Sequence, residues 1–347
     1  MAVVDRFRAG DRDAIESLYR RVFGNDAAHA SRLRWDWQYR HNPNSPAGGA
    51  PIWIAREGPT IVGQHATMPV RLLVQGQEID ASWGNDVMVA PERQRQGIGE
   101  QLFSKWDASV GASLGLGLSE SSERLFRKLR WHVVGPVPCL VKPLTRRALR
   151  RGEWPPALNR LVSAVTLPVV KVVARARPIA GELEPTRRLD ASVTRLWEKV
   201  GPKFDVIVRR DARYLQWKFL NPPHVRYSLV VLRRDGEVAG YAVYRHALEP
   251  HARVTLLVDF LTDPDDRHGL LALLRYLDRE ARAADSDRIR TYCLHTGFRT
   301  LLKRSGYFQV KSSMQFVARI NAVPVSETLY EHTERWHVTM GDSDLDH

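Results

Sequence analysis

The stretch that decides the fold of this chain is residues 85–99, which read NDVMVAPERQRQGIG. Upstream of this stretch, apolar and polar side chains alternate from Ile79 to Val89, as in a half-buried strand, and Pro91 ends the alternation. Downstream, apolar side chains recur at helical spacing, at Ile98, Leu102, Phe103, Trp106 and Val110. The pattern therefore predicts a strand, a turn over residues 94–99 and a helix.

The predicted turn has the features of a pyrophosphate site. The start of a helix exposes several backbone N–H groups at the positive end of the helix dipole. Gly97 and Gly99 let a bulky anion approach that backbone, because neither residue has a Cβ. No Lys-Ser or Lys-Thr pair follows the glycines, which excludes a nucleoside-triphosphate loop, and their spacing does not fit the dinucleotide fingerprint.

The run Gln94-x-x-Gly97-x-Gly99, after Val87-x-Val89-x-Pro91, resembles the acyl-CoA motif of the GNAT (N-acetyltransferase) superfamily. The resemblance implies that the strand holds the pantetheine arm and thioester by main-chain hydrogen bonds and that the turn binds the pyrophosphate. Arg93 would add positive charge beside the phosphates. The cofactor-binding residues predicted in this way are Val87, Met88, Val89, Gln94, Arg95, Gln96, Gly97, Ile98 and Gly99, together with Ser119 and Phe126 further along the chain. The predicted co-substrate is acetyl-CoA.

The residues after the predicted helix extend the resemblance. Leu114, Leu116 and Leu118 alternate with two glycines, which predicts a strand with one bare face, and in the GNAT fold this strand splays from its neighbour to admit CoA. Ser119 then stands where the family usually has an Asn. Phe126 stands in the place of a Tyr that commonly protonates the leaving thiolate, so this chain departs from the family at its general acid.

The same order of blocks occurs twice along the chain, which indicates an internal duplication. Aromatic residues precede Asn42-Pro43 in the first copy and Asn221-Pro222 in the second, and a Gly-containing hairpin turn follows each. We therefore expect a mixed α/β fold of two tandem GNAT-like domains. The predicted ranges are 1–140 for the domain that binds acyl-CoA, 141–182 for a basic helical connector and 183–347 for a degenerate GNAT-like domain.

The second copy lacks the features of a phosphate site. When Pro264 is aligned with Pro91, Leu270 replaces Gly97 and Ala272 replaces Gly99. Asp263, Asp265 and Asp266 fall at the turn, where their negative charge would repel a polyanion. We expect one CoA per chain.

Composition and charge limit the other roles of the chain. Its 347 residues carry a net charge of +13, and residues 141–178 hold nine basic side chains against Glu153. That segment predicts packing between domains or, alternatively, peripheral contact with anionic membranes. Two cysteines and no apolar leader favour a cytoplasmic protein, and no apolar run is long enough to span a membrane. The twelve histidines show no metal-ligand spacing, so we expect no metal, and we expect no nucleic-acid partner.

The predicted activity is acyl transfer from acyl-CoA to a primary amine by direct attack. Asp86, at the entry to the cofactor strand, is the first candidate for the general base, and Glu120 is the second. His65 lies on a segment that flanks the acceptor side in the GNAT fold, and a main-chain N–H of Val87 or Met88 would bind the oxyanion. Two alternatives stay open, an aminoacyl-tRNA-dependent Fem-type transferase and a non-catalytic acyl-CoA sensor. The residues identify neither the acceptor amine nor the oligomeric state.

Overall fold

The structure is a computed structural model that describes residues 2–47, 49–149 and 181–342. The chain divides into two compact units. The first unit comprises Met1–Gly135, Gln216–Val225 and Met314–His332, and the second comprises Pro136–Leu215, Arg226–Ser313 and Thr333–His347. The sequence predicts boundaries near residues 140 and 182, whereas two short segments from the second half of the chain belong to the first unit.

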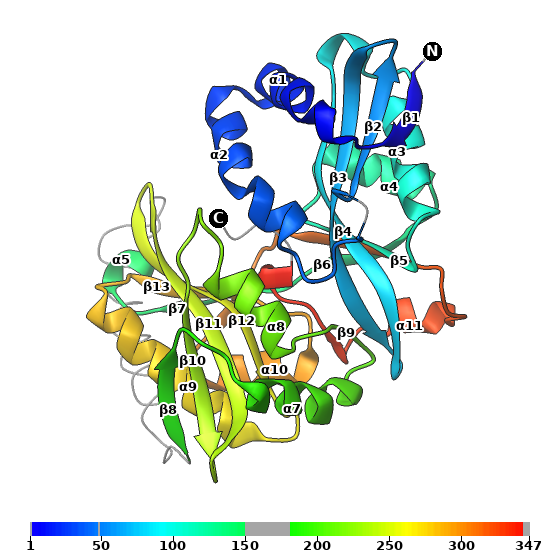
Figure 1. Cartoon of the computed structure of the whole chain (residues 1–347). Helices are drawn as coiled ribbons and strands as arrows, with labels where there is room; N and C mark the ends of the chain where they lie inside the picture. Colours follow the sequence, from blue (N-terminus) through cyan, green and yellow to red (C-terminus); the bar gives the residue numbers. More distant parts are fainter. Residues whose placement is uncertain (1, 48, 150–180, 343–347) are drawn as a thin grey trace. The chain divides into compact units, whose positions relative to one another are not determined.

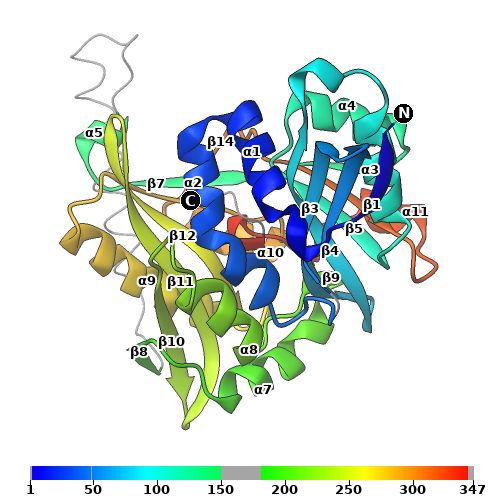
Figure 2. The same cartoon turned by 45° about the horizontal axis from the view of Figure 1, so that its top comes forward.

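The first unit is built on a sheet with strand order β1-β2-β3-β4-β5-β15-β6. Helices α1 and α2 lie on one side of strands β2 to β4, and α3 and α4 lie on the other (Figure 1; Figure 2). Its elements are β1 (Val3–Arg6), η1 (Ala9–Asp11), α1 (Arg12–Phe23), α2 (Asn25–Trp35), the π-helix η2 (Asp36–Arg40), β2 (Ile52–Glu57), β3 (Thr60–Val74), β4 (Gln77–Val89), η3 (Pro91–Arg93), α3 (Ile98–Asp107), β5 (Ala112–Leu116), α4 (Glu120–Lys128), β6 (His132–Pro136), the π-helix η5 (Gln216–Leu220), β15 (Gln315–Ile320) and α11 (Glu327–Glu331).

The second unit is built on a sheet with strand order β14-β7-β13-β12-β11-β10-β8. Apart from this sheet, the second unit contains a short parallel pair, β9 with β16. Its elements are β7 (Cys139–Pro143), α5 (Arg146–Leu149), β8 (Glu182–Thr186), α7 (Ala191–Val200), η4 (Gly201–Lys203), β9 (Val206–Val208), α8 (Ala212–Leu215), β10 (Ser228–Arg234), β11 (Glu237–Glu249), β12 (Ala252–Thr262), α9 (Arg267–Ala283), β13 (Arg288–Tyr292), α10 (Thr296–Arg304), β14 (Phe308–Val310), β16 (Trp336–His337) and η6 (Met340–Asp342). The mixed α/β class predicted from the sequence is confirmed.

The two copies of the repeat exchange a strand. β15 comes from the second copy and pairs with β5 in the sheet of the first unit, with Val317 opposite Gly115. β7 comes at the end of the first copy and pairs with β13 and β14 in the second sheet. The exchange of β15, together with the assignment of Gln216–Val225 to the first unit, is why neither unit is a continuous stretch of sequence.

The aromatic residues before each Asn-Pro pair are core residues. Trp35 and Tyr39 share a face, and their ring centroids lie 4.8 Å apart. Trp37 points the other way and stacks on Trp217 of the π-helix η5, with ring centroids 5.1 Å apart. Each of these two indole Nε1–H groups donates to the other residue's main-chain carbonyl at 2.8 Å. All three aromatic residues before Asn42-Pro43 are therefore part of the core.

The described end of the chain has little regular structure. The sequence predicts a strand over Arg335–Met340 and a solvated acidic tail after it, whereas the segment contains only the two-residue strand β16, and Asp342 is buried. The guanidinium of Arg210 donates to both carboxylate oxygens of Asp342, which explains the burial of this acidic residue. Residues 343–347 lie outside the described part of the chain.

The basic segment 141–178 is described only at its start, where β7 and α5 contribute Lys142, Arg146 and Arg147. The predicted connector helices and the apolar side chains of residues 158–173 lie outside the described residues. Contact with anionic membranes therefore stays a prediction. In the described ranges, no helix is both long enough and apolar enough to cross a membrane.

Candidate functional site

The predicted cofactor residues meet in one pocket of the first unit. It lies between the end of β4, the turn that follows it, and helices α1, α3 and α4. Of the predicted residues, Gln96 and Phe126 do not line it. The lining residues are Val22, Phe23, Val87, Met88, Val89, Arg93, Gln94, Arg95, Gly97, Ile98, Gly99, Glu100, Phe103, Ser119, Ser122, Arg124, Leu125 and Lys128.

Strands β4 and β5 part at this pocket. They pair in parallel only from Ala81 to Trp83, opposite Ala112 to Leu114. On its other edge β4 stays paired with β3 as far as Val89. In the described sheet, the main chain of Val87 to Val89 therefore has no strand partner on the β5 side. A main chain without a partner at the wall of a pocket can bind a ligand that presents amide groups.

The turn after β4 exposes the start of α3. Gly97 precedes the helix in the left-handed conformation, with φ +79°, and no side chain caps the helix. A Cβ on Gly97 would have no neighbour within 4 Å, and one on Gly99 would have only Leu125 Cδ2, at 3.7 Å. The amide groups at the start of α3 thus face open space in the pocket, as an anion site requires.

Positive charge surrounds the exposed helix start. Four basic side chains line the pocket, against one carboxylate, that of Glu100. Glu100 forms an ion pair with Lys128, and Arg93 forms one with Glu57 outside the lining, at 2.9 Å. Arg95 lines the pocket, and its own backbone is in the left-handed region, with φ +62°. The turn is also braced internally, since the Gln94 side chain donates to the Val89 carbonyl and that of Gln96 donates to the Glu92 carbonyl.

Asp86 lies at a β-bulge between β3 and β4 and has φ +44°, a strained conformation for a residue with a side chain. Its carboxylate is nearly buried and accepts three hydrogen bonds. The donors are the hydroxyl of Tyr19 at 2.8 Å, the guanidinium of Arg34 at 2.6 Å and the hydroxyl of Tyr39 at 3.2 Å. Three of about four acceptor positions of a carboxylate are thus occupied.

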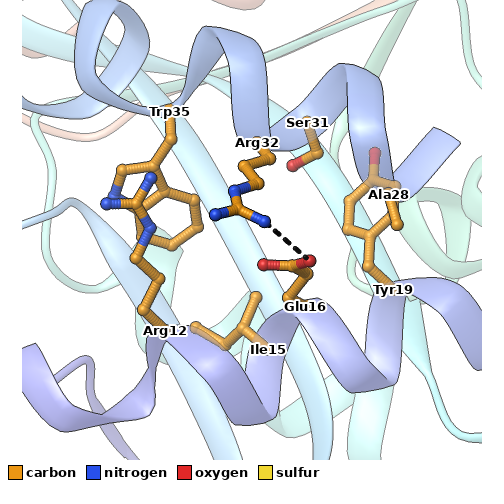
Figure 3. Close-up of a pocket in the computed structure, with 8 residues that line it drawn as sticks. All are labelled: Arg12, Ile15, Glu16, Tyr19, Ala28, Ser31, Arg32 and Trp35. Atoms are coloured by element: carbon orange, nitrogen blue, oxygen red, sulfur yellow. Dashed lines mark ion pairs between the residues drawn. The ribbon is translucent and has the colours of Figure 1, made fainter.

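Tyr39 and Tyr19 differ in their surroundings. Tyr39 is fully buried, and desolvation together with the neighbouring Asp86 raises the pKa of its hydroxyl well above 10. Tyr19 lines a small pocket between α1 and α2, where Arg32 faces Glu16 at 3.9 Å and Arg12 lies over the Trp35 ring (Figure 3). That pocket has room for little more than a water molecule. Tyr19 therefore connects the α1–α2 surface to Asp86.

The other predicted catalytic residues lie elsewhere. Glu120 begins α4 and its side chain is 95% exposed, with Arg124 at 3.8 Å as an ion-pair partner. His65 is fully buried between the rings of Phe103 and Trp106, at 4.6 Å and 4.4 Å. Burial lowers the pKa of His65 to about 3, so its imidazole is neutral at physiological pH. Phe126 is buried against Phe103 and Trp131.

The expectation that the bare face of β5 admits the cofactor arm is wrong at Gly115. A Cβ on Gly115 would meet Val317 at 2.9 Å, Leu118 at 3.0 Å and the Phe126 ring at 3.4 Å, so protein side chains fill that face. Ser119 caps α4, because its hydroxyl accepts from the Ser122 amide at 3.2 Å. Sequence reasoning missed Tyr19 and Arg34, whose contact with Asp86 spans 67 and 52 residues.

Comparison with known proteins agrees with this geometry. Residues 4–114 match the model of the acetyltransferase (GNAT) domain family. The chain contains a GNAT domain. No curated protein matches the sequence.

Solved structures share the fold over most of this GNAT-domain chain. One is a GCN5-related N-acetyltransferase from Anabaena variabilis, with a TM-score of 0.62 at 11% identity over 92% of this chain and 73% of the other. Another is a conserved protein from Enterococcus faecalis described as a probable N-acyltransferase, with a TM-score of 0.64 at 12% identity over 93% and 73%. A third is N-myristoyltransferase from Saccharomyces cerevisiae with bound myristoyl-CoA, with a TM-score of 0.58 at 13% identity over 91% and 82%.

No group of three or more His, Cys, Asp or Glu side chains that could hold a metal ion occurs in the part of the chain that the structure describes.

Proposed function

We propose that this GNAT-domain protein is an acyl-CoA-dependent N-acyltransferase that transfers an acyl group to a primary amine by direct attack. The observation that carries the proposal is the meeting, in one pocket, of an uncapped helix start and an unpaired strand edge. The first suits a pyrophosphate and the second suits the amides of a pantetheine arm. Acetyl-CoA is the proposed donor.

The pocket residues divide into two groups in this proposal. The amides at the start of α3, with Arg93 and Arg95, bind the pyrophosphate. The main chain of Val87 to Val89 holds the pantetheine arm and places the thioester carbonyl beside a main-chain N–H, that of Val87 or Met88, which binds the developing oxyanion. Binding of this kind uses the backbone, so it depends on the path of the chain more than on side-chain identity.

The reaction forms one bond and breaks one. The neutral amine nitrogen attacks the thioester carbonyl carbon, the C–S bond breaks, and CoA leaves as a thiolate that takes up a proton. We assign the removal of the amine proton to Asp86, which has one acceptor position left beside its three donors. Glu120 is the second candidate, from the solvent-exposed start of α4.

The acyl-CoA sensor stays an alternative because Phe126 supplies no hydroxyl. A sensor would bind the same cofactor in the same pocket without turnover. Release of CoA in the presence of an amine panel separates the two functions. The Fem-type transferase has less support, because such a protein does not need the exposed turn over residues 94–99.

The binding step is tested by a charge placed in the turn. Gly99→Glu should leave the protein without acetyl-CoA binding, because like charges about 4 Å apart cost about 4 kcal/mol at an effective dielectric constant of about 20, or about a thousandfold in Kd. The unliganded variant should stay folded, since a glutamate in the first helical turn is favourable and Gly99 has open space. Calorimetry with acetyl-CoA measures the loss.

The matched control is Gln101→Glu, which adds the same charge to an exposed position of α3 that does not line the pocket. Acetyl-CoA affinity close to that of the wild type in Gly99→Glu would contradict the proposed site.

A further inference from the structure

A layer of aromatic rings lies behind the wall of the acyl-CoA pocket at Phe103. Phe103 is the ring of this layer that lines the pocket, and it is 2% exposed. Behind it lie Phe126, edge-on at 4.8 Å, and His65, stacked at 4.6 Å. Trp106 and Trp131 continue the layer, with ring centroids 5.3 Å apart. These five rings pack against one another as a continuous buried layer.

The glycines beside the strand split add no space to the pocket. Gly84 follows the last β4 residue that pairs with β5, and a Cβ there would lie 3.0 Å from Trp106 and 3.1 Å from His65. Gly115 on β5 is covered by Val317 and Phe126. The bare backbone at Gly84 and Gly115 is therefore covered by the aromatic layer and its neighbours.

The split between the strands ends at Trp83, four residues before Val87, where main-chain hydrogen bonding joins β4 and β5 from Ala81 to Trp83. Val87 itself packs against the buried cluster that contains Phe103. An acyl chain that ran past the thioester position at Val87 would meet the rings of this cluster before it reached the end of the split. A well-packed interior does not make room for added methylenes without strain.

We infer that Phe103, backed by Phe126 and Trp106, limits the donor to acyl groups of about the size of acetyl or propionyl. The inference rests on the proposed function and deepens it by naming the specificity-determining residue. The yeast N-myristoyltransferase, which shares the fold, was solved with a long acyl-CoA bound. The difference between the two donors would thus come from side chains and not from the fold.

The test is a calorimetric series with CoA, acetyl-CoA, butyryl-CoA and octanoyl-CoA on the full chain. A buried methylene strengthens binding about fourfold. We expect no such gain beyond propionyl size in the wild type, and a gain of about fourfold per methylene between acetyl- and butyryl-CoA in Phe103→Leu and Phe103→Ala. The control is Phe316→Leu, which removes the same volume from a buried ring beside Trp83 that does not line the pocket.

Wild-type affinity that rises about fourfold per methylene up to octanoyl-CoA would overturn the inference, and this result does not depend on the folding of any variant. An equal gain in Phe316→Leu would overturn the role of Phe103. Absence of binding by CoA itself would contradict the proposed function, which distinguishes that failure from a wrong chain-length limit.

Discussion

Each of the two sheets contains a pair of parallel strands that are joined at one end and part at the other. In the first unit β4 leaves β5 after Trp83, and in the second unit β12 leaves β13 after Leu257. When Pro264 is aligned with Pro91, these two points differ by one residue. The duplicated fold therefore builds the same split twice, and the two splits differ in what occupies them.

The helix that follows the split is open in the first unit and closed in the second. No side chain caps α3, whereas the carboxylate of Asp266 accepts from the amides of His268 and Gly269, at 3.0 Å and 3.1 Å, at the start of α9. A carboxylate at that place satisfies the amides that a phosphate would otherwise bind. Asp263 and Asp265 form ion pairs with Lys203.

The chain's own C-terminal segment contacts both strands of the second split. On the β12 side, the Thr339 hydroxyl donates to Asp259 at 2.8 Å and the His337 ring contacts the Phe260 carbonyl at 2.8 Å. On the other side, the Leu294 amide donates to the Val338 carbonyl at 3.0 Å, just beyond β13. The groups that line an open pocket in the first unit are thus satisfied internally in the second.

The carboxylates of the two splits also diverge. Asp259 aligns with Asp86, and both accept from an arginine and a tyrosine hydroxyl. Asp259 is 1% exposed and belongs to a buried network with Arg210 and Asp342. Asp86 has a strained backbone next to Val87, which lines the pocket. Under the proposed function, the aligned carboxylates differ in role, with Asp259 serving packing in the second unit and Asp86 serving chemistry in the first.

The largest expected difference is in cofactor stoichiometry. We expect calorimetry with acetyl-CoA to give one site per chain, because Asp266 accepts from the first amides of α9 and the C-terminal segment contacts the residues of the second split. The double variant Leu270→Gly and Ala272→Gly should still give one site, since Asp266 and the segment 337–339 remain in place. Two equivalent acetyl-CoA sites in the wild type would show that the second split also binds the cofactor and would contradict the difference between the two units.

The next largest expected effect concerns the aligned carboxylates Asp86 and Asp259 and separates turnover from stability. Asp86→Asn should lower kcat by about 10²–10⁴-fold with little change in acetyl-CoA affinity, because loss of a general base affects the chemical step. Asp259→Asn should leave kcat unchanged and lower the free energy of unfolding by about 1–3 kcal/mol, because Arg210 loses a charged acceptor. Steady-state kinetics measures kcat, and denaturant titration measures the free energy of unfolding. Near-normal kcat in Asp86→Asn would move the role to another group.

The smallest expected effect concerns acid stability. The folded pKa of His65 is about 3, below its ordinary value near 6.5, because burial disfavours the charged ring. The unfolded chain therefore binds a proton that the folded chain does not, so this stability is fully present above about pH 6.5 and is lost as the pH falls toward 3. In His65→Leu, the free energy of unfolding should therefore fall less steeply with decreasing pH, by up to about 1.4 kcal/mol per pH unit.

Denaturant titrations between pH 4.5 and 7 measure this slope, with His29→Leu as the control, because His29 is exposed on α2. An unchanged slope in His65→Leu would show that His65 does not stay neutral in the folded chain. The second unit has its own buried histidines, since burial lowers the pKa of His295 to about 4 and that of His337 well below its ordinary value. Their contribution should persist in His65→Leu.

Much of the candidate site was predictable because it is local in sequence. The strand over residues 79–89, the turn and the helix from Ile98 follow from alternation, glycine placement and helical spacing within about 30 residues. The aligned repeat also predicted the loss of both glycines from the second turn. Extended by one residue, that alignment would have placed Asp259 opposite Asp86.

The chain by itself determined the elements that depend on near neighbours: the motif, the duplication and the exposed turn. Only the tertiary structure decided the strand exchange, the three donors around Asp86, the filled face of Gly115 and the occupied second split. Each of these depends on pairs far apart in sequence, such as Val317 with Gly115 and Thr339 with Asp259. Periodicity reports which face of an element is buried, but many partners of the same polarity could cover it, and packing selects among them.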